Sequence, residues 1–500
     1  MAREPVELIF DVLGGQSNQP IGKLAQGRDL VEMSQASNVI PGDLGDLETS
    51  PGFSKIRATA ILNGPAITGM FHGGDLADFF VLGNSLTGDV AFDTANPPVD
   101  NTSGTNFTTG ANVLLRGDFH ENLLIITSNA RDLPQTVNAS STRADLGGTP
   151  PQGIDYKVFG RRGIMFSPSI GGTAYRSLAS FNSVNDDHDA WTTPLVNALN
   201  FGKYEGETTV LGGEYFQDHL MAFTHNAAYP IYPTPNADLP LAFQQAVFNE
   251  RSGGPTNIHA VVAANDCLYW ISRNFDVKKM RGDRSVVSIG RAVQPFLRGL
   301  NDSRRIYTIG GWEPQYRMVV WAVSDGSDTT NKTLLMLQVD TGQFYFRTIS
   351  RNAFANRIVS GELRLIGGGY SGFFYNEFDS STTGNLDDAA SAIDADIMTP
   401  RHHLGLPGIY KKSPYAWVEL DPIGSESVTF QYQLDDSNTW TSFSGSPVTV
   451  SGNDALNIFL PTPFVFERIR LRFRDANSGE RFRVLRYGFP RPSIMKARLS

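Results

Sequence analysis

The residues of this chain whose types could carry metal chemistry lie in two short clusters. Asp186-Asp-His-Asp189 places three carboxylates and an imidazole side by side, and His402-His403 pairs two imidazoles. Carboxylate oxygens and imidazoles attract divalent cations. However, adjacent residues on one loop rarely all point at one ion, and His402-His403 has no Cys or carboxylate at ligand spacing. We therefore interpret both clusters as polar loops, and we expect neither a metal nor a cofactor.

Other residues and motifs that could carry chemistry give equally weak evidence of a functional site. Cys267 is the single cysteine, which excludes an internal disulfide framework, and its strand-like surroundings predict an inert buried thiol. Arg281-Gly-Asp283 has the composition of a turn. The chain contains no Gly-x-Ser-x-Gly elbow, no phosphate loop and no Cys-x-x-Cys. We expect that the protein is not an enzyme, although its many acidic residues leave a glycosidase carboxylate pair open.

One strand carries an unusual row of cations. In Arg468-Ile-Arg-Leu-Arg-Phe-Arg474 the arginines share one face and the apolar residues share the other. Stacked guanidiniums require carboxylates, phosphates or the acidic face of a partner. Two interpretations stay open, namely a solvated face paired with acidic neighbours across strands and a contact with another subunit or partner. The candidate assembly residues are Arg468, Arg470, Arg472 and Arg474.

The net charge of −9 conceals an asymmetry along the chain. Residues 464–500 hold ten basic residues against three acidic ones, so the first 463 residues carry a net charge of −16. Proteins that grip nucleic acid cluster Lys and Arg. A body this acidic instead suits a surface that DNA must pass without sticking.

The clearest architectural signal lies in residues 305–348. Residues 305–309, 316–323, 333–340 and 343–348 predict four short strands, with turns at Gly310-Gly311, 324–332 and Thr341-Gly342. Four such strands make one blade of a β-propeller. Weaker copies recur over residues 56–385, and residues 363–375 either close the ring or begin another blade. The predicted fold is all-β, with a propeller of about six blades.

The flanks differ from this propeller. Residues 1–55 are broken repeatedly by Gly and Pro and predict an irregular docking arm, without the apolar core of a signal peptide. After a polar linker at 382–392, longer alternating strands predict a β-sandwich over residues 393–490, followed by a tail at 491–500. No apolar run approaches the roughly 20 residues that span a bilayer.

The C-terminal region resembles a family of short-tailed bacteriophage (podovirus) tail proteins. The matching pattern is a strand ending in Thr399, a Gly-Pro-like turn at 404–408, a Lys at 411–412, and the Asp435-Asp436 turn before Trp440. The arm is also similar, through its Gly14-Gly15 and Pro51-Gly52-Phe53, although Ser50 stands where many relatives have Arg. The family comprises tail nozzle (tail tubular protein B-like) and packaged-DNA-stabilising tail-hub proteins.

The resemblance implies a structural virion protein that forms a ring, a homohexamer, below the head-to-tail adaptor or portal complex. The ring would form and gate the DNA-ejection channel. Its other implied partners are tail fibres or a needle, genomic DNA that passes without sequence recognition, and the host cell envelope at infection. Loops that narrow the lumen would retain the DNA, and the candidate channel loop is Tyr229–Pro240, with Tyr229, Tyr232 and Asn236.

Two alternatives belong to other functional classes. Propellers and sandwiches both host lectins, so a receptor- or glycan-binding tail protein is the second hypothesis, and a glycan-cleaving propeller enzyme is the third. A hexameric ring favours the nozzle, and a trimer with sugar affinity favours the receptor-binding protein. Turnover of a polysaccharide favours the enzyme.

Overall fold

The chain forms two compact units. One comprises Lys55–Leu334 and Ile349–Glu377, and the other comprises Met1–Ser54, Leu335–Thr348 and Phe378–Ser500. The computed structural model describes residues 8–11, 22–23, 29–30, 35–42, 46–73, 81–84, 86–95, 97–101, 103–140, 142–205, 208–236, 239–249, 253–359, 361–379, 391–404, 408–422, 424–452, 456–462, 464–477, 481–490 and 492–495. Most of the predicted linker and most of the predicted tail lie outside these residues.

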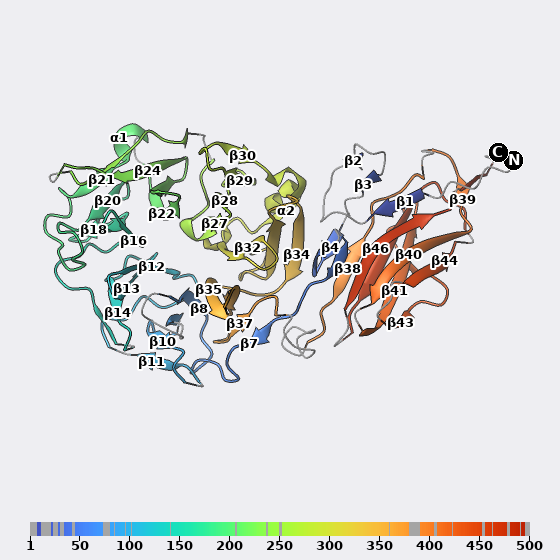
Figure 1. The fold of residues 1–500 in the computed structure, drawn as a ribbon, viewed down its shortest axis with the longest axis horizontal. Helices are drawn as coiled ribbons and strands as arrows, with labels where there is room; N and C mark the ends of the chain where they lie inside the picture. Colours follow the sequence, from blue (N-terminus) through green and yellow to red (C-terminus); the bar gives the residue numbers. More distant parts are fainter. Residues whose placement is uncertain are drawn as a thin grey trace. The chain divides into compact units, whose positions relative to one another are not determined.

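The first unit is a propeller, which confirms the predicted fold class (Figure 1). Its innermost strands follow one another around a closed ring, from β8 through β12, β16, β22, β27, β31 and β35 back to β8. The described residues therefore supply seven blades, where the sequence suggested about six. Each blade reads outward from its innermost strand in chain order, as expected when short strands are reversed by tight turns.

The first four blades have the following bounds: β8 (Ile67–Phe71), β9 (Val81–Asn84), β10 (Val90–Phe92) and β11 (Val99–Asn101); β12 (Leu115–His120), β13 (Leu123–Ser128), β14 (Gln135–Val137) and β15 (Arg143–Asp145); β16 (Asp155–Phe159), β17 (Arg162–Phe166), β20 (Leu178–Phe181) and β21 (Ala198–Asn200); β22 (Val210–Phe216), β23 (His219–Thr224), β24 (Ala227–Pro233) and β25 (Leu241–Phe243), with β26 (Phe248–Asn249) beside β24. A small ladder of β18 (Ser169–Ile170) and β19 (Thr173–Ala174) accompanies the third blade.

The fifth blade comprises β27 (Val262–Ala264), β28 (Cys267–Ile271), β29 (Val277–Met280) and β30 (Val286–Ser288). The sixth begins with β31 (Ile309–Glu313) and β32 (Met318–Val323), after which the chain continues through β33 (Thr333–Gln338) and β34 (Phe344–Thr348). The seventh contains β35 (Ala353–Val359), β36 (Glu362–Gly368) and β37 (Phe374–Asn376).

The seventh blade is completed by chain from before the first. The segment after β7 (Ser54–Lys55) runs along β37, where the Ile56 N–H donates to the Phe374 carbonyl at 3.1 Å. Joining the start of the ring to its last blade removes the open sheet edge that would otherwise remain. Residues 363–375 thus belong to the blade that closes the ring.

Two details of the predicted sixth blade are wrong. Residues 305–307 form a 3-10 helix, η4 (Arg305–Tyr307), and the first strand begins at Ile309. Gly310 and Gly311, predicted as a turn, lie inside β31. A Cβ atom at Gly310 would collide with the Val262 side chain of the neighbouring blade, so glycine here serves close packing of adjacent innermost strands rather than chain reversal.

Helices are few and short among the described residues. They are α1 (Gly202–Glu205), α2 (Gln294–Gly299), η2 (Ile258–Ala260) and η3 (Gly290–Val293), in addition to η4. In the part of the chain that is described, no helix has the length and apolar character needed to cross a membrane.

The second unit is a two-sheet sandwich built from both ends of the chain. One sheet has the order β2-β3-β1-β46-β40-β44, with β6 also pairing with β46 and β5; the other includes the order β34-β4-β38-β45-β41-β42, with β43 beside β41. The Tyr487 and Phe473 rings, one from each sheet, have centroids 6.0 Å apart in the core.

The strands of this unit have the following bounds: β1 (Leu8–Asp11), β2 (Gly22–Lys23), β3 (Asp29–Leu30), β4 (Gln35–Ser37), β5 (Val39–Pro41), β6 (Leu47–Thr49), β38 (Ala395–Met398), β39 (Lys411–Lys412), β40 (Tyr415–Pro422), β41 (Gly424–Leu434), β42 (Thr441–Ser442), β43 (Val448–Gly452), β44 (Leu456–Pro461), β45 (Ile469–Asp475), β46 (Phe482–Phe489) and β47 (Ser493–Ile494), with β39 paired to β47.

Up to Thr49, the described segments of the predicted irregular arm contribute strands to this sandwich, whereas β7 at its end joins the seventh blade. Glu48 of β6 faces Arg483 of β46 in register, and the Arg483 guanidinium bonds Glu48 Oε2 at 2.6 Å and Asp46 Oδ2 at 2.8 Å. Both carboxylates are buried. Ion pairs across more than 400 residues therefore fasten residues 46–49 to the C-terminal domain, a link that Gly- and Pro-rich sequence does not reveal.

We predict that Arg483→Met destabilises the sandwich by about 3 kcal/mol, because removing one partner of a buried ion pair leaves carboxylates uncompensated. The measurement is the free energy of unfolding in urea. Arg468→Met is the matched control, since its partner Asp436 is 78% exposed, and its unfolding midpoint should stay that of the wild type. Equal midpoints for the two variants would contradict the assigned role of Arg483.

Candidate functional site

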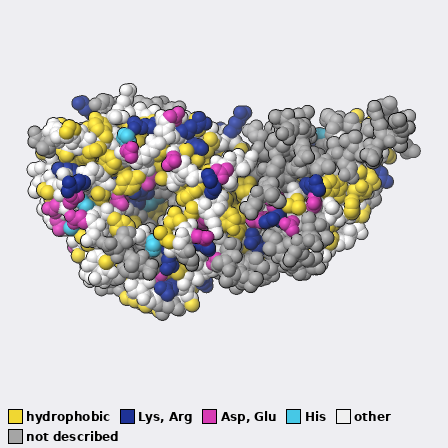
Figure 2. Space-filling view, in the orientation of Figure 1, with side chains coloured by type: hydrophobic (Ala, Val, Ile, Leu, Met, Phe, Trp, Pro, Cys, Tyr) yellow, Lys and Arg dark blue, Asp and Glu magenta, His cyan; other side chains and the backbone are white. Residues whose placement is uncertain are grey.

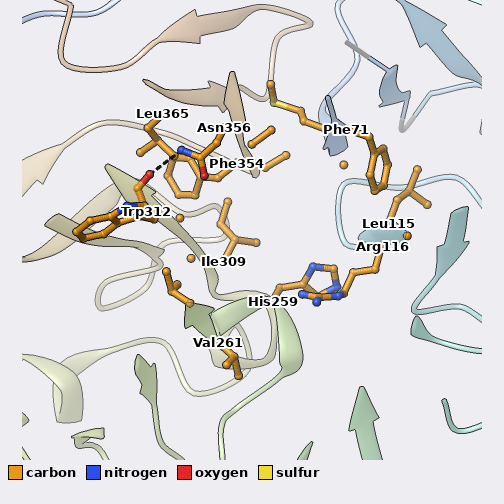
Figure 3. A pocket seen from close by; sticks show the side chains of 18 of the residues that line it. Phe71, Leu115, Arg116, His259, Val261, Ile309, Trp312, Phe354, Asn356 and Leu365 are labelled. Carbon is orange, nitrogen blue, oxygen red and sulfur yellow. Dashed lines mark hydrogen bonds between the residues drawn. The ribbon is translucent and has the colours of Figure 1, made fainter. Parts of the chain in front are cut away.

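The innermost strands of the propeller surround a cavity of about 340 Å³. Its walls come from β8, β12, β22, β27, β31 and β35 (Figure 3). Leu115, Ile309, Phe354 and Leu365 contribute apolar side chains, but most of the lining surface is polar. Arg116 and His259 lie together at one side (Figure 3).

Close approach of the strands depends on glycine at the axis. A Cβ atom at Gly117 of β12 would collide with the Ile125 carbonyl oxygen of the adjacent strand. Any other residue would push β12 and β13 apart. The Arg116 side chain, one position earlier, can then reach the next two blades.

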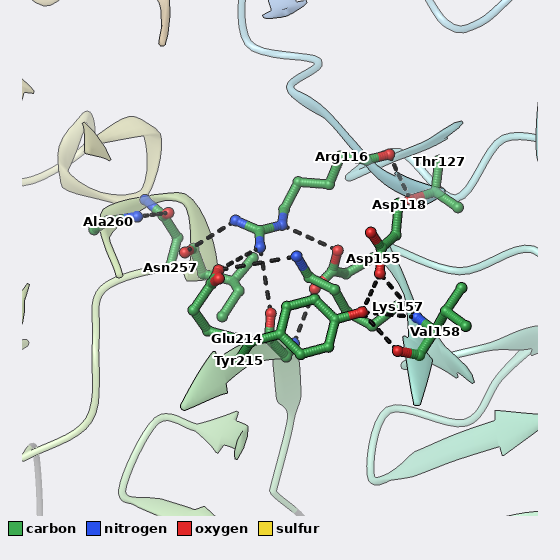
Figure 4. Close-up of polar contacts among 12 residues, drawn as sticks. Arg116, Asp118, Thr127, Asp155, Lys157, Val158, Glu214, Tyr215, Asn257 and Ala260 are labelled. Atoms are coloured by element: carbon green, nitrogen blue, oxygen red, sulfur yellow. Dashed lines mark hydrogen bonds and ion pairs between the residues drawn. The ribbon is translucent and has the colours of Figure 1, made fainter. Parts of the chain in front are cut away.

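Arg116 is the centre of a buried ionic network that spans three blades (Figure 4). Its Nε donates to Asp155 Oδ1 of β16 at 3.0 Å, and Nη2 donates to Glu214 Oε2 of β22 at 2.9 Å. Further bonds reach the carbonyls of Ile258 and Gly213, both at 3.3 Å. Lys157 Nζ lies 4.0 Å from Glu214 Oε2, so two cations face two carboxylates.

Burial and charge compete in setting the pKa values of this network. Burial alone would lower the pKa of Arg116, but Asp155 and Glu214 outweigh it and raise that pKa. For Asp155, whose carboxylate has 0% exposure, burial raises the pKa despite Arg116 and Lys157. For Glu214, burial is outweighed by Lys157 and Arg116, and the pKa is lowered. Burial, with Arg116 and Lys157, holds the pKa of His259 well below its usual range, so its ring is neutral.

Beside the network, a second set of hydrogen bonds joins the second, third and fourth blades. The Tyr215 hydroxyl lies within hydrogen-bond distance of the Asp118 carboxylate and of the Val158 carbonyl, and its single proton can be donated to either one. The Val158 N–H donates to Asp118 Oδ2 at 2.9 Å. Tyr215 comes from β22, Val158 from β16 and Asp118 from β12, so these contacts connect the same three blades as Arg116 does.

The arrangement acts as a clamp between blades. The charged groups at the axis neutralise one another, and the bonds of Arg116 cross from blade to blade. Such a buried network is strongly disrupted when one member is removed. We infer that the role of this network is structural, because its bonds hold neighbouring blades together.

The predicted arginine face lies on and just before β45, and each described guanidinium faces partners within the sandwich. Arg472 makes a bidentate pair with Asp396, at 2.8 and 2.7 Å, and Arg474 pairs likewise with Asp394, at 2.7 and 2.6 Å. Arg468 binds both oxygens of Asp436. Arg470 donates to the Thr399 carbonyl and lies over Trp440. The face is therefore paired across strands with acidic neighbours, and an assembly contact there stays a prediction.

The candidate channel loop is wrong in its first half. Tyr229 and Tyr232 lie in strand β24, and Tyr229 is buried against Phe201 and Phe243. The run Ala-Ala-Tyr-Pro-Ile-Tyr-Pro forms a strand whose first five residues are buried, where the sequence analysis expected a loop. Asn236 alone of the three is exposed beyond the strand end, and its role in a channel is untested.

The two possible metal clusters separate in the structure. Among the described residues no group of three His, Cys, Asp or Glu side chains is placed to hold a metal ion. Asp189 accepts from the Gly147 N–H at 2.9 Å, and Asp186 pairs with Arg161. His402 is buried in the sandwich, where its Nε2 lies 2.8 Å from the Tyr487 hydroxyl. Cys267, predicted as buried, is partly exposed.

Sequence reasoning missed the Arg116 network entirely. Arg116, Asp155 and Glu214 are far apart in the chain and match no motif. One signal was present, because Leu114-Leu-Arg116 and Asp155-Tyr-Lys157 put charges inside otherwise apolar strands. Charges buried in strands require partners, but their identity depends on which blades are adjacent.

Comparisons with known proteins find no family and only weak structural similarity. No protein-family model matches the chain. No curated protein matches it either. Among solved structures it is similar to BBS1N in complex with ARL6DN (9% identity, 66% of this chain and 98% of that chain, TM-score 0.41) and to the N-terminal domain of Nup159 (9%, 73% and 98%, 0.41). BamB from Moraxella catarrhalis is similar at 10% identity, with 73% and 98% covered and a TM-score of 0.37. Likenesses this weak carry no functional argument.

We predict that Arg116→Leu destabilises the propeller by about 3–5 kcal/mol, because Asp155 and Glu214 would remain buried without their partner. Urea unfolding measures the effect. Arg161→Leu, which removes an exposed pair, is the control and should unfold like the wild type. If Arg116→Leu also unfolds like the wild type, the network does not hold the blades.

A pH dependence follows from His402. Burial lowers the pKa of His402 to about 3, from 6.5. Between these values the unfolded chain binds a proton that the folded chain does not. The stability of the sandwich should therefore fall by about 1.4 kcal/mol per pH unit as the pH drops below 6.5. Calorimetric unfolding should show a flatter dependence for His402→Gln over pH 5 to 6.5, and identical slopes would contradict this.

Proposed function

We propose that this protein is a structural, non-enzymatic component of a short-tailed bacteriophage tail, a nozzle or hub subunit that assembles as a homohexameric ring around the DNA-ejection channel. The proposal includes a location in the virion, and the head-to-tail adaptor or portal complex, tail fibres or a needle, and the host envelope as partners.

The observation that carries the proposal is the structural role of the residues that match the family pattern. Thr399 ends β38, and its hydroxyl accepts from the Leu471 N–H of β45 at 2.9 Å. Lys411 is buried, and its Nζ donates to the carbonyls of His403 and Glu467, both at 2.7 Å. Asp435 Oδ1 accepts from the Glu467 and Arg468 N–H groups, at 2.7 and 2.9 Å.

These contacts explain why the pattern recurs as a set. The Thr joins two strands, the Lys satisfies carbonyls inside the domain, and the Asp caps the start of β45. Trp440, the last member, lies 5.5 Å from Arg470 and 5.6 Å from Arg472. A chain that keeps the spacing keeps the same sandwich, which supports the resemblance residue by residue.

The distribution of charge supports a conduit role. The first 463 residues carry a net charge of −16, and on the propeller face in Figure 2 acidic and basic side chains are interspersed. Neither feature offers a phosphate backbone a continuous basic track. DNA would pass such a surface with little ionic friction.

We predict that the purified chain, alone or with its adaptor, gives six-fold rings in electron-microscopy class averages. The reason is that the proposed channel exists only when subunits close around it. Mass spectrometry of purified virions should find the chain in the tail. A chain that stays monomeric with the adaptor present and is absent from virions would refute the proposal. A trimer that binds glycans would support the receptor-binding alternative instead.

A further inference from the structure

A groove of about 710 Å³ lies on the propeller, away from the central cavity. Two tight turns and a 3-10 helix form it. The first turn joins β23 to β24 and holds His225, the second joins β28 to β29 and holds Arg273 and Phe275, and η4 supplies Arg305 and Ile306. Strands β24, β28 and β29 are labelled in Figure 1.

We propose that this groove binds a partner protein through an acidic segment, with a carboxylate paired to Arg273 and Arg305 and an adjacent apolar side chain placed against Phe275 and Ile306. This inference does not depend on the proposed function.

The first support is a set of polar groups that lack partners. Arg273 is exposed, and within the described part of the chain its guanidinium makes no hydrogen bond or ion pair. Arg305 Nε, Thr256 Oγ1 and His225 Nδ1 are buried and have no hydrogen-bond partner. Thr256 itself is only 5% exposed. Unused buried groups of this kind are rare in native proteins and call for a ligand or water.

The second support is the orientation of Arg305. Its guanidinium stacks on the Phe275 ring at 4.0 Å from the centroid, and its Nη2 donates to the Arg273 carbonyl at 2.7 Å. These contacts hold the planar cation in place. A pre-oriented guanidinium loses little conformational freedom on binding a carboxylate.

The third support is apolar surface beside the cations. Ile306 is 53% exposed. Phe275 has a φ of 62°, a left-handed conformation that costs energy for an aromatic residue. The turn therefore presents the ring at the groove despite backbone strain, and a segment with an aliphatic or aromatic side chain would cover both residues.

The charged side chains that line the groove favour an anionic ligand. Arg273 and Arg305 are the cations of the groove, and Asp302 is its one lining carboxylate, bound to Arg305 at 2.8 Å. Burial and the nearby Arg273 lower the pKa of His225 to about 4, so that ring is neutral at pH 7. Arg273 has no such pair, so the groove can accept one further carboxylate, whereas a phosphate backbone requires a longer basic track.

The test uses a short fluorescein-labelled peptide in which glutamate and leucine alternate, and a matched peptide with glutamine in place of glutamate. Fluorescence anisotropy with the full chain measures binding. We expect the glutamate peptide to bind about tenfold or more tightly than the glutamine peptide, because a charge-assisted bond exceeds a neutral one. Thr256→Val should weaken binding a few-fold, and Arg273→Glu at least about tenfold.

The matched control is Arg281→Glu, an exposed arginine of the same blade outside the groove. It should bind the peptide as the wild type does, and thermal unfolding should show that all variants are folded. Equal binding of the two peptides, an equal loss in Arg281→Glu, or no saturable binding would overturn the proposal. So would duplex DNA that displaces the peptide and depends on Arg273, since the ligand would then be a phosphate.

Discussion

Seven strands must converge on one axis in the propeller, and the rest of that unit is organised around the crowding that results. Side chains at the axis have little room, so Gly117 and Gly310 stand where a Cβ atom would collide with the adjacent strand. Arg116, Asp155 and Glu214 lie close together near this axis and neutralise one another. Buried charges stabilise the propeller only when all their partners are present. Because those partners come from adjacent blades, the network forms only when the blades are in this order.

The same crowding explains what sequence could and could not predict. Short strands and turn residues indicated a propeller correctly, because those signals are local. Gly310-Gly311 was misassigned as a turn, since glycine in a strand and glycine in a turn look alike without the neighbouring blade. Arg116 could be recognised as a charge within an apolar strand, but its partners Asp155 and Glu214 could not, because they come from other blades.

In the sandwich, the sequence pattern predicted one part of the arrangement and missed another. The alternation in residues 468–474 predicted correctly which side chains share a face, and the predicted pairing with acidic neighbours is what the structure contains at Asp394, Asp396 and Asp436. The identity of those neighbours required the order of β38, β45 and β41, which pattern alone does not supply. The prediction for Tyr229 was wrong because the residue lies in strand β24, with its ring buried against Phe201 and Phe243.

The interleaving of the two chain ends has a consequence for synthesis. Residues 46–49 leave the ribosome early, yet their partners Arg481 and Arg483 are made more than 400 residues later. Contacts this distant in sequence form last, because loop closure must precede them. A chain whose translation stops early therefore has an unpaired N-terminal segment and no complete sandwich. The topology in this way distinguishes finished chains from truncated ones by whether the sandwich can close.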